Sequence, residues 1–164
     1  MVRLAVAIAL LLLTGCGDDA SVPATCPQGN VLSAMNEYVD GSVFIDTQWD
    51  AMPNTDLAAA LEAGGIACSY GIQEAEIGAT VLWSSAEAFD SRRAQWKSDG
   101  QVQVDVMGAD EAWVLQEVVN NNERHLWAIN LLVDGVWIHI AATFLPDLDA
   151  AGSLVAAAIA ELRG

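Results

Sequence analysis

Residues 126–145 read LWAINLLVDGVWIHIAATFL, and this stretch decides how the chain folds. It is largely apolar and about as long as a membrane-spanning helix, which needs about 20 apolar residues. However, Asp134-Gly135 stands near its middle between β-branched residues, and that dipeptide is typical of the type I′ turn of a β-hairpin. A two-residue turn pairs Val133 with Val136 and sorts the side chains between two faces. We therefore favour a hairpin over a membrane-spanning helix.

The two faces of the predicted hairpin differ in polarity. Trp137 falls on the more polar face, directly opposite Leu132. If that face is open, Trp137, Leu132 and Leu126 form an exposed apolar patch of the kind that marks a binding site. The competing interpretation is that a helix covers this face. The apolar face carries Trp127, Ile129, Leu131, Val133, Val136, Ile138, Ile140 and Phe144, and the polar face carries Arg124, Asn130, Leu132, Trp137, His139 and Thr143.

The pattern on either side of the hairpin predicts further strands and helices. Most strand connections are short, which favours an antiparallel sheet. The sequence therefore predicts an α+β fold, a mainly antiparallel sheet of about five to six strands with helices packed on one face, in a single domain over residues 26–164. The expected helices are 30–39, 55–63, 84–100 with Ser84 and Glu87 as a capping box, and 147–162, and the expected flanking strands are 66–72, 77–83, 102–106 and 111–119.

The composition excludes several classes of protein. The chain has 164 residues and a formal net charge of −16, from 6 Lys and Arg against 22 Asp and Glu. Since 54% of the residues are hydrophobic, it forms a core and is not a disordered acidic tail. Only Arg92, Arg93 and Lys97 form a basic cluster, so we expect no nucleic-acid partner and no electrostatic docking on anionic lipids.

The N-terminus has the pattern of an export signal. Arg3 is followed by the apolar run Leu4–Leu13, which is too short to span a bilayer. An ordinary secretory signal or a buried helix is the alternative. Leu13-Thr14-Gly15-Cys16 resembles the lipobox of bacterial lipoproteins. The resemblance implies that residues 1–15 are a signal peptide, that Cys16 carries a diacylglyceryl group, and that the protein is anchored to the outer (or periplasmic) face of the cell membrane. Residues 16–25 then form the lipidated cysteine and a flexible tether.

The other two cysteines form an even pair. If Cys16 carries lipid, Cys26 and Cys68 remain in an oxidising compartment, and we expect them to form a disulfide. It would close a loop of about 40 residues, worth roughly 4 kcal/mol in the chain-entropy model. A metal site is the weaker interpretation because no histidine is near either cysteine, and a redox pair is weaker still because there is no C-x-x-C motif.

Several short motifs resemble a group of small actinobacterial cell-envelope lipoproteins of unknown function. They are the lipobox, an early cysteine after a short tether, Cys68-Ser69-Tyr70, the segment Gly108-Ala109-Asp110-Glu111-Ala112-Trp113, and the final hairpin followed by an Ala/Leu helix. The resemblance implies export, a membrane anchor and an α+β domain, and it supplies no catalytic residues.

The sequence contains no recognised catalytic motif. There is no G-x-S-x-G elbow and no calcium loop, and the only histidines, His125 and His139, are predicted on opposite faces of the hairpin. The G-x-G-x-x-A run Gly15–Ala20 follows no strand, so we expect no dinucleotide cofactor, and we expect no metal and no catalytic residues. The sequence thus favours a binding or interaction module with an unidentified small molecule or envelope protein as partner. The alternatives are an envelope hydrolase that uses surface carboxylates and a structural surface protein without a ligand.

Overall fold

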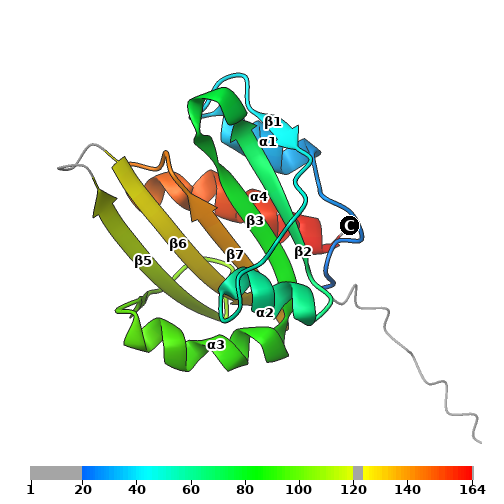
Figure 1. The fold of residues 1–164 in the computed structure, drawn as a ribbon, viewed down its shortest axis with the longest axis vertical. Coiled ribbons are helices and arrows are strands. Elements are labelled where there is room, and N and C mark those ends of the chain that lie inside the picture. The colour runs from blue at the N-terminus through cyan, green and yellow to red at the C-terminus, as the bar shows by residue number, and fades with distance from the viewer. Residues whose placement is uncertain (1–19, 120–123, 164) are drawn as a thin grey trace, which may run out of the picture.

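A seven-stranded sheet organises the chain, in the order β1-β2-β3-β7-β6-β5-β4 (Figure 1). All six pairings of neighbouring strands are antiparallel.

The structure is a computed structural model and describes residues 20–119 and 124–163, so the predicted signal peptide 1–15 and Cys16 lie outside the described residues. The strands are β1 Val43–Ile45, β2 Ile66–Ile72, β3 Ile77–Ser85, β4 Val102–Gln103, β5 Glu111–Val119, β6 Arg124–Val133 and β7 Val136–Ala142. The helices are α1 Gly29–Asn36, α2 Asp56–Glu62, α3 Ala86–Ser98 and α4 Gly152–Ala160, with 3-10 turns η1 Gln73–Ala75, η2 Asp149–Ala151 and η3 Glu161–Arg163.

The central hairpin has the predicted register. Val133 pairs with Val136, and Leu132 pairs with Trp137. Asp134 and Gly135 both have positive φ, 48° and 81°, as a type I′ turn requires. In the described part of the chain, no helix combines the length and the apolar character needed to cross a membrane.

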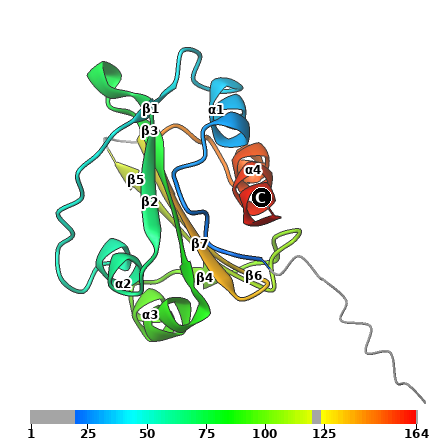
Figure 2. The same cartoon turned by 90° about the vertical axis from the view of Figure 1, so that its right-hand side faces the viewer.

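Helices cover both faces of the sheet. Seen edge-on, α1 and α4 lie on one side and α2 and α3 on the other (Figure 2). The predicted α+β fold with one antiparallel sheet is confirmed, with seven strands where about five to six were expected. The prediction that the helices pack on one face is wrong, because α2 and α3 cover the part of the more polar face around the buried Trp137 and Asn130.

The larger core lies between the sheet and the pair α1 and α4. The apolar face of the hairpin points into it. The Trp83 indole donates to the Ala158 carbonyl of α4 at 3.1 Å, and the Trp127 indole donates to the Leu145 carbonyl in the loop after β7 at 2.9 Å. Burying these large side chains while satisfying their N–H groups stabilises the stacking of α4 on the sheet.

The start of α3 differs from the prediction by one residue. Ser85, not Ser84, caps the helix by accepting the Ala88 N–H at 3.3 Å, and the expected Ser84–Glu87 capping box does not form. The reason is that β3 continues through Ser85, which pairs with Val136. The Ser84 hydroxyl is buried and donates instead to the Ala60 carbonyl of α2 at 3.0 Å.

Two other strands also differ from the prediction. The segment 102–106 is a strand only at its first two residues. The Val104 N–H still donates to the Ala112 carbonyl of β5 at 3.1 Å, and the backbone then turns between Val106 and Ala109. At the opposite edge, β1 was not predicted, since its three residues are too few to show an alternating pattern.

Candidate functional site

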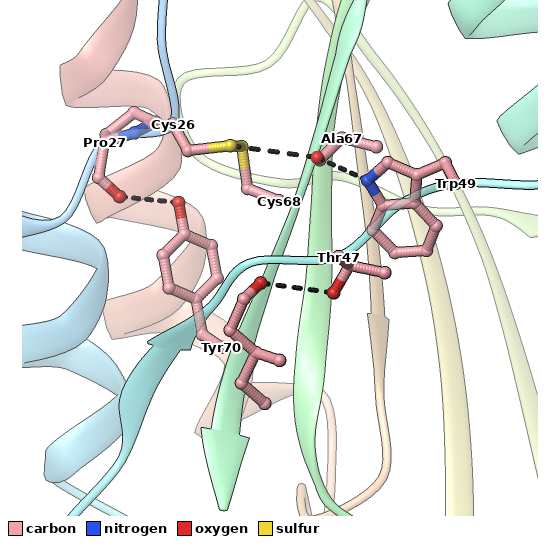
Figure 3. Close-up of a disulfide and its surroundings, with 8 residues drawn as sticks. Cys26, Pro27, Thr47, Trp49, Ala67, Cys68 and Tyr70 are labelled. Carbon is pink, nitrogen blue, oxygen red and sulfur yellow. Dashed lines mark hydrogen bonds between the residues drawn. A yellow bond between two sulfur atoms is a disulfide. The ribbon is translucent and has the colours of Figure 1, made fainter. Parts of the chain in front are cut away.

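A disulfide ties the start of the domain to the sheet (Figure 3). Cys26 precedes α1, and Cys68 lies in β2, where its side chain is buried in the core under α1. The predicted pairing of Cys26 with Cys68 is therefore present, and it leaves neither sulfur for the metal or redox alternatives. A disulfide is typical of proteins that fold in an oxidising compartment.

Side-chain hydrogen bonds hold two segments against β2 from opposite faces of the sheet, one at Pro27 beside the disulfide and one at Trp49 in the loop before α2. Tyr70 donates its hydroxyl to the Pro27 carbonyl at 2.5 Å, and on the other side Trp49 donates its indole N–H to the Ala67 carbonyl at 2.7 Å (Figure 3). Burial raises the pKa of the Tyr70 hydroxyl, and the negative charge of Glu161 raises it further, so the phenol stays protonated as a donor.

The first described residues lie against the last ones. The Ser21 N–H donates to the Leu162 carbonyl at 3.2 Å, and Ala20 and Val22 pack against the larger core. These three residues fall within the segment predicted as a flexible tether, 16–25, yet they belong to the packed domain. The N-terminal segment therefore joins the packed domain beside the end of α4.

The structure does not form the predicted apolar patch. Trp137 has none of its surface exposed, because Phe89 and Trp96 of α3 pack against its ring with centroids 6.3 and 5.5 Å away. Leu132 is half-buried beside it, and Leu126 lies six residues further along β6, about 20 Å away. The helix-covered alternative holds, and Trp137 is part of a second core between the sheet and α3.

Polar side chains form a connected network beneath α2 and α3. The Asn130 side-chain oxygen accepts from the Trp137 indole at 3.0 Å and lies 2.8 Å from His139 Nδ1. The Asn130 amide donates to Gln101 at 3.1 Å. Asn130 and His139, which are opposite each other in the hairpin register, therefore form a pair that lies below the helices.

Asp56 extends the network into both helices. From α2 it accepts the Arg92 Nε–H at 2.6 Å and the Trp96 indole N–H at 2.9 Å, and its second oxygen lies 3.7 Å from His139 Nδ1. Among the described residues, no buried side-chain nitrogen or oxygen lacks a hydrogen-bond partner, so the sheet buries these polar groups without unsatisfied donors or acceptors.

The environment of His139 determines its protonation. Burial lowers the pKa of His139, and the Asp56 charge opposes that effect only in part. Since Asn130 offers an acceptor to Nδ1, the neutral ring carries its proton there. His125 lies on the opposite face of the hairpin, with its Nδ1 atom 3.0 Å from the Pro146 carbonyl oxygen. The described residues contain no cluster of three or more His, Cys, Asp or Glu side chains suited to a metal.

We expect the free energy of unfolding to fall in acid because of His139. Its pKa is lower in the folded state than the value of about 6.5 of an unfolded chain, so the unfolded state binds the proton more readily. The contribution of the neutral His139 ring to the free energy of unfolding is complete above about pH 6.5. It is lost as the pH falls below that value, by at most about 1.4 kcal/mol per pH unit. Chemical denaturation between about pH 7.5 and pH 5 should show a shallower slope for His139→Gln than for the wild type. Gln103→Asn, an exposed control that carries no titrating group, should keep the wild-type slope; equal slopes for all three proteins would contradict the assignment.

A half-open cavity of about 280 Å³ lies between α4 and the turn that follows β4. We call it the α4 cavity. Its apolar lining comes from Val106, Met107, Leu148, Gly152, Val155 and Ala156, and Asp105 and Asp149 complete the lining. Its size is near the lower limit of small-molecule sites. The sequence prediction missed this site; its only local signal is Gly152 and Ala156, two small residues four positions apart on a helix.

The carboxylates of the α4 cavity suit binding better than proton transfer. The Asp105 and Asp149 residues are both exposed, whereas a catalytic general acid needs a desolvated carboxyl group.

Elsewhere, the Arg93 guanidinium donates to Glu111 at 2.7 Å and lowers the pKa of Glu111, so this carboxyl group is held ionised. Such an environment does not suit Glu111 to act as a general acid.

Comparisons with models of known families, with curated proteins and with solved structures found no match to this chain, so its function is inferred from the sequence and the geometry.

Proposed function

We propose that this protein is an exported lipoprotein that is anchored through Cys16 to the outer (or periplasmic) face of the cell membrane, where its domain serves as a binding module. The Cys26–Cys68 disulfide carries this proposal, because such bonds persist in oxidising compartments outside the cytosol. The lipobox-like sequence before Cys16 and the resemblance to small envelope lipoproteins support it from the sequence side.

The path of the chain is compatible with an anchor close to the domain. Ser21 is hydrogen-bonded to Leu162 and lies five residues after Cys16. Five residues span at most about 18 Å, so a lipid on Cys16 would hold the end of α4 within that distance of the bilayer surface. Two acyl chains give stable attachment, whereas a single chain binds a membrane only marginally.

The α4 cavity supports binding over a purely structural role. A structural surface protein needs no cavity, and this one places exposed apolar surface next to two exposed carboxylates. That combination is typical of a recognition site for a small ligand or side chain. The binding role therefore rests on the cavity, and the location rests on the N-terminus and the disulfide.

Intact-mass measurement of the full chain, expressed in a bacterium and extracted in mild detergent, tests the location. We expect the wild type to have lost residues 1–15, to carry a diacylglyceryl group, and to lack the two hydrogens that Cys26 and Cys68 lose on pairing. Cys16→Ala should keep the signal and carry no lipid, while Ser21→Ala, a control outside the lipobox-like sequence, should be lipidated. A wild-type chain that is unlipidated and has reduced cysteines would overturn the proposal.

A further inference from the structure

The α4 cavity exists because one face of α4 has almost no side chains. Gly152 and Ala156 are four residues apart, so they lie one above the other on the same face of the helix, and both are exposed. A Cβ added to Gly152 would meet no atom within 4 Å. The space in front of these two residues is therefore open and is not filled by a neighbouring side chain.

The opposite wall is a tight turn that is fixed against the same helix. The Ala109 N–H donates to the Val106 carbonyl at 3.1 Å, and Gly108 takes φ +88°, which suits glycine in such a turn. A Cβ on Gly108 would lie 3.4 Å from the end of the Ile159 side chain, so the turn approaches α4 closely at that point. The turn holds Met107 at the cavity with 95% of its surface exposed. Exposed methionine is unusual in a monomer surface and adapts its shape to apolar ligands.

The charge around the cavity is entirely negative. Asp105 comes from the turn and Asp149 from η2, and neither carboxylate has a hydrogen-bond or ion-pair partner among the residues that the structure describes. No Lys, Arg or His lines the cavity. The N-terminal end of α4 contributes about half a positive charge, but two full negative charges exceed it, and Asp147 already accepts the Ala150 N–H at 2.9 Å.

We propose that the α4 cavity binds an organic cation, an ammonium ion carried on a compact hydrocarbon body. The hydrocarbon would contact Val155, Met107 and the open face at Gly152, and the ammonium group would lie between Asp105 and Asp149. This inference rests on the proposed binding function and names its ligand class. It does not depend on the membrane anchor, so a failure here leaves the lipid measurement unaffected.

Cyclohexylammonium is the probe, with cyclohexanol and cyclohexanecarboxylate as neutral and anionic probes of nearly the same shape. The full chain in a zwitterionic detergent is titrated with each, and backbone amide shifts are followed by NMR. We expect cyclohexylammonium to shift the amides of residues 105–108 and 149–156. Cyclohexanol should bind roughly fivefold more weakly and the carboxylate more weakly still, because the two exposed ion pairs are lost or become repulsive. Salt should reduce this difference.

Two pairs of variants locate the ligand. Gly152→Leu fills the cavity and should weaken binding of the ammonium probe roughly tenfold or more, whereas Gly152→Ala leaves most of the space and should keep it. Asp105→Asn with Asp149→Asn should abolish the preference for the cation. Glu62→Gln with Glu87→Gln removes the same charge from exposed positions on α2 and α3 and should leave that preference unchanged.

Three outcomes would overturn the proposal. The first is equal affinity for the ammonium and the alcohol, which would show that the carboxylates do not recognise charge. The second is an absence of shifts at residues 105–108 and 149–156 with every probe. The third is a loss of preference in the Glu62 and Glu87 control, which would attribute the effect to net charge alone.

Discussion

Replacing Trp137 with alanine should lower the free energy of unfolding by about 3–5 kcal/mol. The indole is fully buried between the sheet and α3, and it is hydrogen-bonded to Asn130. Its loss leaves a cavity beneath Phe89 and Trp96 and removes one of the donors to the buried Asn130 oxygen. Urea denaturation followed by far-UV circular dichroism measures the change without relying on tryptophan fluorescence.

Met107→Ala is the control for this measurement, because the Met107 side chain is exposed and its truncation should change the free energy of unfolding by less than about 0.5 kcal/mol. The comparison also separates the two interpretations of the hairpin's more polar face. A Trp137→Ala variant as stable as Met107→Ala would mean that Trp137 is accessible, as in the exposed-patch interpretation, and that α3 does not cover it.

Removing the disulfide should cost about 4 kcal/mol. Cys26 and Cys68 are 42 positions apart, and the unfolded chain gains the freedom of that whole loop when the bond is absent. Cys26→Ala with Cys68→Ala is the variant of choice, because alanine puts no polar group into the buried position of Cys68. Its free energy of unfolding should match that of the wild type measured in reductant.

Reductant itself provides the control for the disulfide, since it should destabilise the wild type and leave the double variant unchanged. A double variant as stable as the oxidised wild type would contradict the prediction. In that case the hydrogen bond from Tyr70 of β2 to the Pro27 carbonyl would suffice to hold the start of the domain.

The predicted parts of the fold are those whose determinants are local. Asp134-Gly135 specifies a turn, the turn specifies the register, and the register places Asn130 opposite His139. The disulfide also follows from a count of cysteines once Cys16 is set aside. These inferences need no knowledge of which other element approaches the hairpin.

The second helical layer could not be predicted in the same way. Asn130 and His139 give their face a polar pattern, and a polar face predicts exposure to solvent. The structure buries it because Asp56, Arg92 and Gln101, which are distant in sequence, supply the partners. The α4 cavity depends likewise on a turn near residue 107 meeting a helix about 45 residues later, and no periodicity in either segment specifies that meeting.

The disulfide also has a mechanical consequence. A force applied to the N-terminal segment reaches the Ser21–Leu162 hydrogen bond first, and then passes through the Cys26–Cys68 bond into β2. The helices α1 and α2 and strand β1 lie inside the loop that the bond closes, so they carry none of the load. The load falls on β2, which is paired with β3 along its full length from Ile66 to Ile72. A domain held by its N-terminus can therefore be pulled without unravelling from that end.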